Sequence, residues 1–250
     1  MAAPPSRGVS APEARGASPA LALCRAGAPD GVRGAALPLV KICCLSSAEE
    51  VAIAAACGVD LFGFVTAPLL GLGVVQDAVA AELIAQVPAD RGAVLLTGWT
   101  EEAALVAQIA RCQPTHVQLV SPTTPSLRGS LRARFPGLSL LQVVHVRGPE
   151  ALAEARDAAE EADGLVLDTA GGTQLGATGR THDWSISGAI VAACSVPVLL
   201  AGGLAADNVA EARRIVGPAG FDLCSSVRVQ GRLDAARLAA FVGAARGAWG

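Results

Sequence analysis

The sequence predicts an α/β protein: a single (β/α)8 barrel, also called a TIM barrel, with a disordered N-terminal extension. Hydrophobic residues make up 52% of the 250 residues and charged residues 16%, so a large core can be buried. From about residue 37, short apolar runs alternate with helix-like stretches. They recur about every 22 to 32 residues, the length of one strand-helix unit. Eight such units fit one barrel.

Residues 1–36 are rich in Ala, Pro, Gly, Ser and Arg and almost free of aromatic and β-branched residues. Such a segment cannot build a core, so we expect it to be disordered and the barrel domain to span residues 37–250. Arg and Ser with few acids also faintly suggest an organelle transit peptide. An upstream GC-rich tail or a misassigned start explains the composition equally well. We therefore expect a cytoplasmic protein.

The eight strands are expected where short aliphatic runs are bounded by polar, Gly or Pro residues. These runs are Leu39–Cys43, Leu61–Val65, Ala93–Leu96, His116–Val120, Leu138–Val146, Gly164–Asp168, Val196–Leu200 and Phe221–Cys224. Helix starts are expected at Ser47, Thr100, Pro149, Asp183, Asp207 and Asp234. A doubly wound open sheet competes with the barrel, but no strand followed by GxGxxG begins the chain.

Charge and cysteine content exclude several classes of protein. The net charge of −3 gives no electrostatic footprint for nucleic acid or an anionic membrane surface. No apolar run approaches the roughly 20 residues that a membrane span needs. The seven cysteines form no CxxC pair and no Cys/His ligand spacing, so neither a metal site nor a disulfide framework is expected. Most are expected to be small core residues in a reducing compartment.

Candidate catalytic groups lie at the carboxyl ends of the expected strands, where barrels of this kind carry their chemistry. Lys41 and Cys43 are two residues apart and therefore share a face of the first strand. If Cys43 faces the barrel mouth, the ammonium group of Lys41 favours its thiolate and lowers its pKa. Asp168 ends an apolar strand, where burial raises a carboxyl pKa. A thiolate and a protonated carboxyl suit a base and acid pair.

Simpler roles stay open for the same residues. A cysteine in an aliphatic strand is usually a packing residue. An acid directly after a buried strand also caps turns, which is the competing role of Asp168. Lys41, the single lysine among 19 basic residues, can extend along the barrel toward water without touching a substrate. Asp183 is interpreted as a helix N-cap.

Glycine-rich loops follow the sixth and seventh expected strands, and a Ser pair follows the eighth. Glycine lets backbone N–H groups approach an anion, and a helix start adds a favourable dipole. A single Gly pair is usually only a turn, but the combination predicts a phosphorylated small-molecule substrate. The candidate binding residues are Lys41, Gly176, Thr178, Gly179, Gly202, Gly203, Ser225 and Ser226.

Several motifs follow one another in a specific order: Val40–Cys43, Gly58–Val65, Gly176–Gly179, His182–Trp184, Leu200–Leu204 and Asn208–Val209. Together they resemble the phosphoribosylanthranilate isomerase family of tryptophan biosynthesis, from about residue 37 to the end. The resemblance implies a (β/α)8 barrel that performs an Amadori rearrangement, an aldose-ketose isomerisation of an N-phosphoribosyl aryl amine, without a cofactor. It implies that Cys43 is the general base that removes the C2′ proton and that Asp168 is the general acid that opens the furanose ring. The backbone around Gly202, Gly203 and Ser225 would hold the phosphate.

Four segments depart from the family pattern. The family's Ser-Pro-Arg, whose arginine contacts the anthranilate carboxylate, is replaced within Leu69–Gly73, and its Gln-Leu-His-Gly reads Gln118–Ser121. Its Ser-Ser-Gly-Val-Glu reads Cys224–Arg228, and the glycine after the catalytic cysteine is Cys44. Losing a bidentate carboxylate partner weakens binding unless another cation replaces it. The candidate replacement cations are Arg147, Arg180 and Arg228.

Three functions remain after this comparison. The preferred one is an isomerase acting on phosphoribosylanthranilate or on a different N-glycosylated amine. The second is a non-catalytic homologue that binds a phosphorylated ligand. An aldolase ranks last, because Lys41 is the only lysine available for a Schiff base and lies on an unsuitable strand. No nucleic-acid or membrane partner is expected, and the chain is expected to be a monomer or a homodimer.

Overall fold

The computed structural model describes residues 37–169 and 181–247. The expected extension, residues 1–36, lies outside the described residues. So do four predicted site residues, namely Gly176, Thr178, Gly179 and Arg180.

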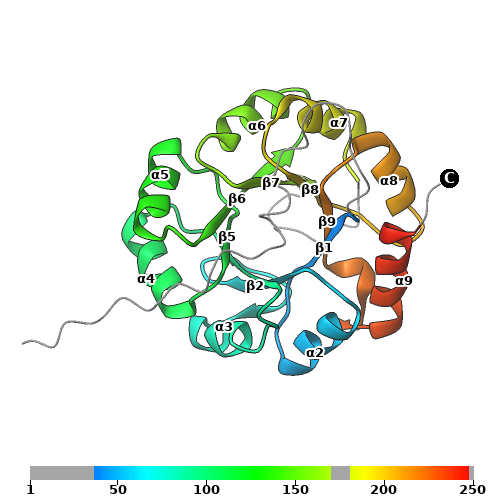
Figure 1. Ribbon diagram of the computed structural model, residues 1–250, viewed down its shortest axis with the longest axis horizontal. Coiled ribbons are helices and arrows are strands. Elements are labelled where there is room, and N and C mark those ends of the chain that lie inside the picture. Colours follow the sequence, from blue (N-terminus) through cyan, green and yellow to red (C-terminus); the bar gives the residue numbers. More distant parts are fainter. Residues whose placement is uncertain (1–36, 170–180, 248–250) are drawn as a thin grey trace, which may run out of the picture.

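Within the described ranges, eight parallel strands close into a barrel, because β1 pairs with both β2 and β9 (Figure 1). The strands are β1 (Leu39–Ile42), β2 (Leu61–Thr66), β4 (Gly92–Thr97), β5 (His116–Leu119), β6 (Ser139–Val146), β7 (Gly164–Thr169), β8 (Val198–Leu200) and β9 (Gly220–Leu223). The predicted fold class is confirmed. Each expected strand agrees with an observed one to within two residues at either end.

Helices surround the barrel (Figure 1). They are α2 (Ala48–Ala56), α3 (Asp77–Ile84), α4 (Glu102–Cys112), α5 (Pro125–Arg134), α6 (Ala151–Ala159), α7 (Trp184–Ala193), α8 (Val209–Val216) and α9 (Ala235–Arg246). Ser47, Asp183 and Asp234 accept hydrogen bonds from the first turns of α2, α7 and α9, as their N-cap positions predict. Smaller elements were not expected: the two-residue strands β3 (Val74–Val75), β10 (Arg228–Val229) and β11 (Arg232–Leu233), and the 3-10 turn η1 (Ser225–Val227).

Strand alternation divides the core into two parts. Residues such as Ile42 and Phe62 pack outward against the helices, whereas Leu61, Val94 and Val166 fill the barrel interior. Side chains in a strand point alternately to opposite faces, so this division follows from the period of two. The interior is filled except near the carboxyl ends of the strands, where the cavity described below lies.

None of the helices formed by the described residues has the length and apolar character that crossing a bilayer requires.

Candidate active site

A cavity of about 270 Å³ lies at the carboxyl ends of the barrel strands. Cys43, after β1, and Asp168, at the end of β7, both line it. Strands β8 and β9 lie between β1 and β7 in the barrel, so the two side chains approach the cavity from different sides. The structure therefore brings together the thiol and the carboxyl that the sequence singled out.

Asp168 is placed to hold a proton. Burial raises its pKa to about 6 and the nearby Asp222 adds to the shift, while His145, its register partner on β6, opposes it. The backbone N–H of Thr169 donates to Asp168 Oδ1 at 2.8 Å, which fixes the carboxyl group. A carboxyl with this pKa is partly protonated near neutral pH and can act as a general acid.

Lys41 does not line the cavity. Its fully buried Nζ lies 2.7 Å from Oδ2 of Asp222 on β9, so the two form an ion pair inside the barrel. Lys41 was expected either to bind the substrate or to extend toward water. This placement disagrees with both roles, since the ammonium group reaches neither the cavity nor solvent. Asp222 does line the cavity, so Lys41 acts on the site only through its partner.

The expectation that the pKa of Cys43 is lowered is wrong. The pKa of Cys43 is raised to about 12, chiefly because its thiol donates a hydrogen bond to Cys224, with burial adding to the shift. Lys41 lowers the value, but it is the weakest of the causes. Cys224 carries the opposite change: its pKa is lowered, chiefly because its sulfur accepts a hydrogen bond from the Cys43 thiol. These opposite directions favour the thiolate on Cys224 over the thiolate on Cys43.

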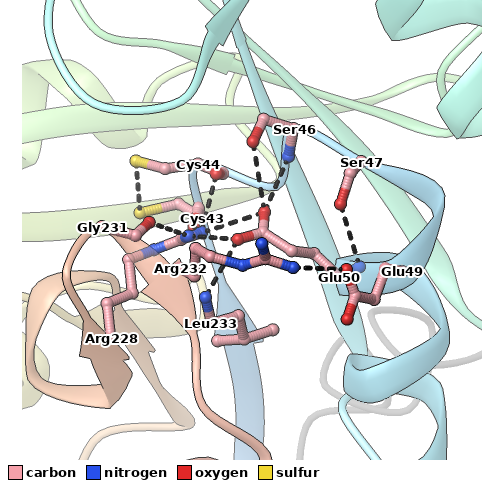
Figure 2. A network of polar contacts seen from close by, with 10 residues as sticks. All are labelled: Cys43, Cys44, Ser46, Ser47, Glu49, Glu50, Arg228, Gly231, Arg232 and Leu233. Atoms are coloured by element: carbon pink, nitrogen blue, oxygen red, sulfur yellow. Dashed lines mark hydrogen bonds and ion pairs between the residues drawn. The ribbon is translucent and has the colours of Figure 1, made fainter.

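Three thiols thus share one side of the cavity. The sulfur atoms of Cys43, Cys44 and Cys224 all lie within 4.8 Å of one another, and the Cys44 thiol donates to the Cys43 sulfur at 3.6 Å (Figure 2 shows this contact). Sequence reasoning did not place Cys44 or Cys224 in the site. Both are departures from the family pattern, and strands β1 and β9 become neighbours only when the barrel closes. Two cysteine departures at adjacent strand ends were the available signal.

The predicted phosphate loops line the same cavity. Gly202 and Gly203 adopt positive φ angles of 87° and 64°, and a Cβ on Gly202 would overlap the hydroxyl of Thr169. Asn208 fixes the loop, because its Nδ2 donates to the Gly203 carbonyl at 2.9 Å and its Oδ1 accepts from the Ala205 N–H at 2.8 Å. The backbone conformation there is thus set before any ligand arrives.

Ser225 and Ser226 form the start of η1 directly after Cys224 and also line the cavity. The Ser226 hydroxyl oxygen is buried and has no hydrogen-bond partner among the described residues. Buried hydroxyl groups are normally satisfied, so an unpaired one in a residue that lines a cavity points to a partner that the described residues do not supply.

Two of the candidate replacement cations, Arg147 and Arg228, are not among the described residues that line the cavity. Arg147 is exposed at the end of β6 and Arg180 lies outside the described residues. Arg228 is buried in another role. Its guanidinium binds Glu50 Oε1 at 2.5 Å and donates to the Cys44 carbonyl at 2.7 Å and the Cys43 carbonyl at 3.3 Å (Figure 2). Arg228 therefore braces the cysteine turn and does not present a free cation to a substrate.

Apolar side chains occupy the segment where the family carries its arginine. Leu69 is buried, whereas Leu70 and Leu72 are 82% and 40% exposed, and all three line the cavity. The described cavity wall contains no Lys or Arg. The described residues at this end of the cavity thus offer an aromatic ring an apolar contact surface and supply no cation for a carboxylate.

Comparisons with known proteins agree with this geometry. The sequence pattern of the family described as N-(5'-phosphoribosyl)anthranilate (PRA) isomerase matches residues 40–244. The chain is 37% identical over 216 residues to the N-(5'-phosphoribosyl)anthranilate isomerase of Haloferax volcanii, which covers 84% of this chain and 94% of that protein. It is 33% identical over 192 residues to N-(5'-phosphoribosyl)anthranilate isomerase 2 of Methanosarcina mazei, covering 76% of this chain and 85% of the relative.

Solved structures give the same result. The N-(5'-phosphoribosyl)anthranilate isomerase from Pyrococcus furiosus superposes with a TM-score of 0.70 at 25% identity, covering 84% of this chain and all of that one. The phosphoribosyl anthranilate isomerase from Thermococcus kodakaraensis gives a TM-score of 0.71 at 26% identity, with 85% of this chain covered. The chain therefore belongs to the N-(5'-phosphoribosyl)anthranilate isomerase family.

Proposed function

We propose that this protein is an aldose-ketose isomerase of the phosphoribosylanthranilate isomerase type, which performs the Amadori rearrangement of an N-phosphoribosyl aryl amine in tryptophan biosynthesis. One observation carries the proposal: Cys43 and Asp168 face a single cavity that also contains the Gly202–Gly203 and Ser225–Ser226 turns. An acid, a base and an anion-binding backbone in one cavity are the three parts that the reaction needs.

The phosphate is proposed to bind at the backbone N–H groups around Gly202, Gly203 and Ser225, with the Ser226 hydroxyl as a further donor. This position directs the ribose ring toward Asp168 and Cys43. Protonated Asp168 gives its proton to the ring oxygen, so that the C1′–O bond breaks and a protonated Schiff base forms. Cys43 then takes the C2′ proton, and the resulting enolamine becomes the ketose after proton transfer to C1′.

Cys43 must lose its own proton before it can act. Because the Cys224 sulfur is the adjacent acceptor, a proton shift across one hydrogen bond converts Cys43 to the thiolate. Cys224 thus serves as a positioning residue that carries the negative charge of the cluster until it accepts the Cys43 proton. It has no assigned contact with the substrate.

Turnover of phosphoribosylanthranilate, followed as fluorescence loss, tests the proposal directly. We expect Cys43→Ser and Asp168→Asn each to lower kcat by roughly 10²–10⁴-fold, while competitive inhibition by inorganic phosphate stays unchanged. The same variants should fail to complement a tryptophan auxotroph that lacks this step. Undiminished turnover in both variants would remove the mechanism. Tight ligand binding in calorimetry without conversion would instead favour a non-catalytic homologue.

A second candidate substrate is favoured by the apolar wall at Leu69, Leu70 and Leu72. The described residues of this wall supply no cation, so a carboxylate brought to it would lose hydration without gaining an ion pair from them. An N-phosphoribosyl amine whose ring lacks the carboxylate fits these residues better. Comparing kcat/KM for N-phosphoribosyl aniline and phosphoribosylanthranilate decides between the two amines. A higher value for the aniline derivative supports the altered substrate.

We also propose a cytoplasmic location and a monomeric or homodimeric state. The isomerase from Thermotoga maritima, a structural relative, is described as dimeric. Sedimentation of the full chain tests the second point.

A further inference from the structure

The three-cysteine cluster offers ligand chemistry that the isomerase reaction does not need. We infer that Cys43, Cys44 and Cys224 form a binding site for a soft divalent metal ion of the Zn²⁺ class, with a fourth coordination position open to the cavity. Within the described ranges, this is the one group of three or more Cys, His or acidic side chains with ligand atoms close enough to share an ion.

The distances fit such an ion. With Zn–S bonds of about 2.3 Å, sulfurs around one tetrahedral ion lie roughly 3.8 Å apart. The Cys43 and Cys44 sulfurs are 3.6 Å apart and all three lie within 4.8 Å. Shifts of less than about 1 Å would therefore complete three bonds to a metal ion.

The backbone holds the sulfurs together before any ion binds. Cys44 adopts φ 65°, in the left-handed region that a residue with a side chain enters at a cost. Two contacts maintain this conformation. Arg228 donates to the Cys43 and Cys44 carbonyls. Gly73 packs so closely on Cys44 that a Cβ on Gly73 would overlap the Cys44 carbonyl oxygen. A glycine would occupy position 44 without strain, so the cysteine adds a sulfur where the backbone does not favour a side chain.

Donor type and charge select the metal. Three thiolates favour Zn²⁺, Cd²⁺ or Cu⁺ over Mg²⁺ and Ca²⁺, which prefer oxygen. Lys41 lies two residues before Cys43, and Arg228 donates to the Cys43 and Cys44 carbonyls, so both cations lie near the sulfurs. A divalent ion that displaces three thiol protons leaves a complex of charge −1 beside these cations. All three cysteines line the cavity, which provides the entry path and room for a water ligand.

Metal binding and proton transfer use the same sulfur. Zn²⁺ on Cys43 occupies the lone pair that would accept the C2′ proton, so the metal-bound protein should be inactive and chelation should restore turnover. This consequence rests on the proposed function, whereas the metal site itself does not.

The test uses the full chain without an affinity tag, reduced and freed of metal with a chelator. Zn²⁺ affinity is measured by competition with a chromophoric chelator, and thiolate coordination by the ultraviolet charge-transfer absorption of the Cd²⁺ form. We expect one Zn²⁺ per chain and at least a 100-fold loss of affinity in Cys224→Ser and in Cys44→Gly. Cys44→Gly relieves the positive φ angle, and Cys224→Ser changes one atom, so neither should unfold the barrel. Cys194→Ser, which removes a half-buried thiol outside the cavity, is the matched control and should bind as the native chain does.

Two results would overturn the site. One is equal Zn²⁺ affinity in the native chain and in both cluster variants. The other is a disulfide among the three cysteines, detected by mass spectrometry in protein kept in a reducing glutathione buffer, since oxidised sulfurs cannot bind the ion. Because affinity is measured without substrate, a protein that binds Zn²⁺ but turns over no N-riboside refutes the proposed function and leaves the metal site standing.

Discussion

The two ends of the cavity differ in how closely they follow the family pattern. At one end, the Gly202–Ala205 turn keeps the family motif and is fixed by Asn208. At the other, Leu69–Leu72 replace the arginine segment, and Cys44 replaces a glycine nearby. The end that keeps the family motif is the one proposed to bind the phosphate, and the end that departs from it is the one proposed to contact the amine. The comparison therefore indicates that any change in substrate is to be sought in the amine.

The largest effect is expected from replacing Arg228, which supports the Cys43–Cys44 turn at the end of the cavity that departs from the family pattern. Arg228→Leu leaves Glu50 buried without its cation, and breaking such a pair costs about 3–5 kcal/mol in the free energy of unfolding, measured with urea. Arg232→Leu is the control, because Arg232 pairs with Glu49 at an exposed position and should cost less than about 1 kcal/mol. Equal losses in the two variants would contradict the role assigned to the buried pair.

The same pair sets a pH dependence. Burial raises the pKa of Glu50, but hydrogen bonds from Arg228 and from the Ser46 and Leu233 N–H groups outweigh it, so the pKa is lowered. Its stabilising contribution is complete above the ordinary glutamate pKa and is lost as the pH falls through the lowered value. The difference in the free energy of unfolding between the native protein and Arg228→Leu should therefore become smaller as the pH is lowered.

At the retained end, Gly202→Ala should raise the KM by roughly 10- to 100-fold. The methyl group would overlap Thr169 and φ 87° is strained for alanine, so the turn must shift away from its phosphate-binding form. Gly243→Ala is the control. That glycine lies inside α9 with open space around its Cβ position, so the protein should gain roughly 0.5–1 kcal/mol with unchanged kinetics. A normal KM in Gly202→Ala would separate this turn from phosphate binding.

Asp168, the proposed general acid, should determine how kcat/KM depends on pH. Because the pKa of Asp168 is raised to about 6 and the protonated form is the active one, kcat/KM should fall toward tenfold per pH unit above that value. The profile of native protein is compared with the residual activity of Asp168→Asn. If the same alkaline fall persists in the variant, another group causes it.

The smallest effect is expected from returning a cation to the apolar end. Leu72→Arg should raise kcat/KM for phosphoribosylanthranilate by about fivefold, since a partly exposed ion pair contributes about 1 kcal/mol. The rate for N-phosphoribosyl aniline should stay unchanged or fall. A gain for both amines would show that the arginine acts on something other than the carboxylate.

The sequence was sufficient for the barrel, because aliphatic strand runs and helix N-caps are local features that tertiary contacts only refine. It also predicted Cys43, Asp168 and the glycine turns, which follow from position at strand ends. The partners of buried charges were not predictable in this way. Lys41 meets Asp222 and Arg228 meets Glu50 only after the chain closes on itself, about 180 residues later in each case. The same closure brings Cys224 to Cys43 and reverses the expected direction of the Cys43 pKa.

Two turns of the cavity are held by side chains that are not among its described lining residues: Asn208 supports the Gly202–Gly203 turn and Arg228 supports the Cys43–Cys44 turn. Supports that never meet the substrate are not altered when the substrate changes. Random mutagenesis confined to Leu69, Leu70 and Leu72 can therefore search for new amine selectivity while both supported turns stay intact. Such a library would offer directed evolution a starting point whose sugar-phosphate recognition is already in place.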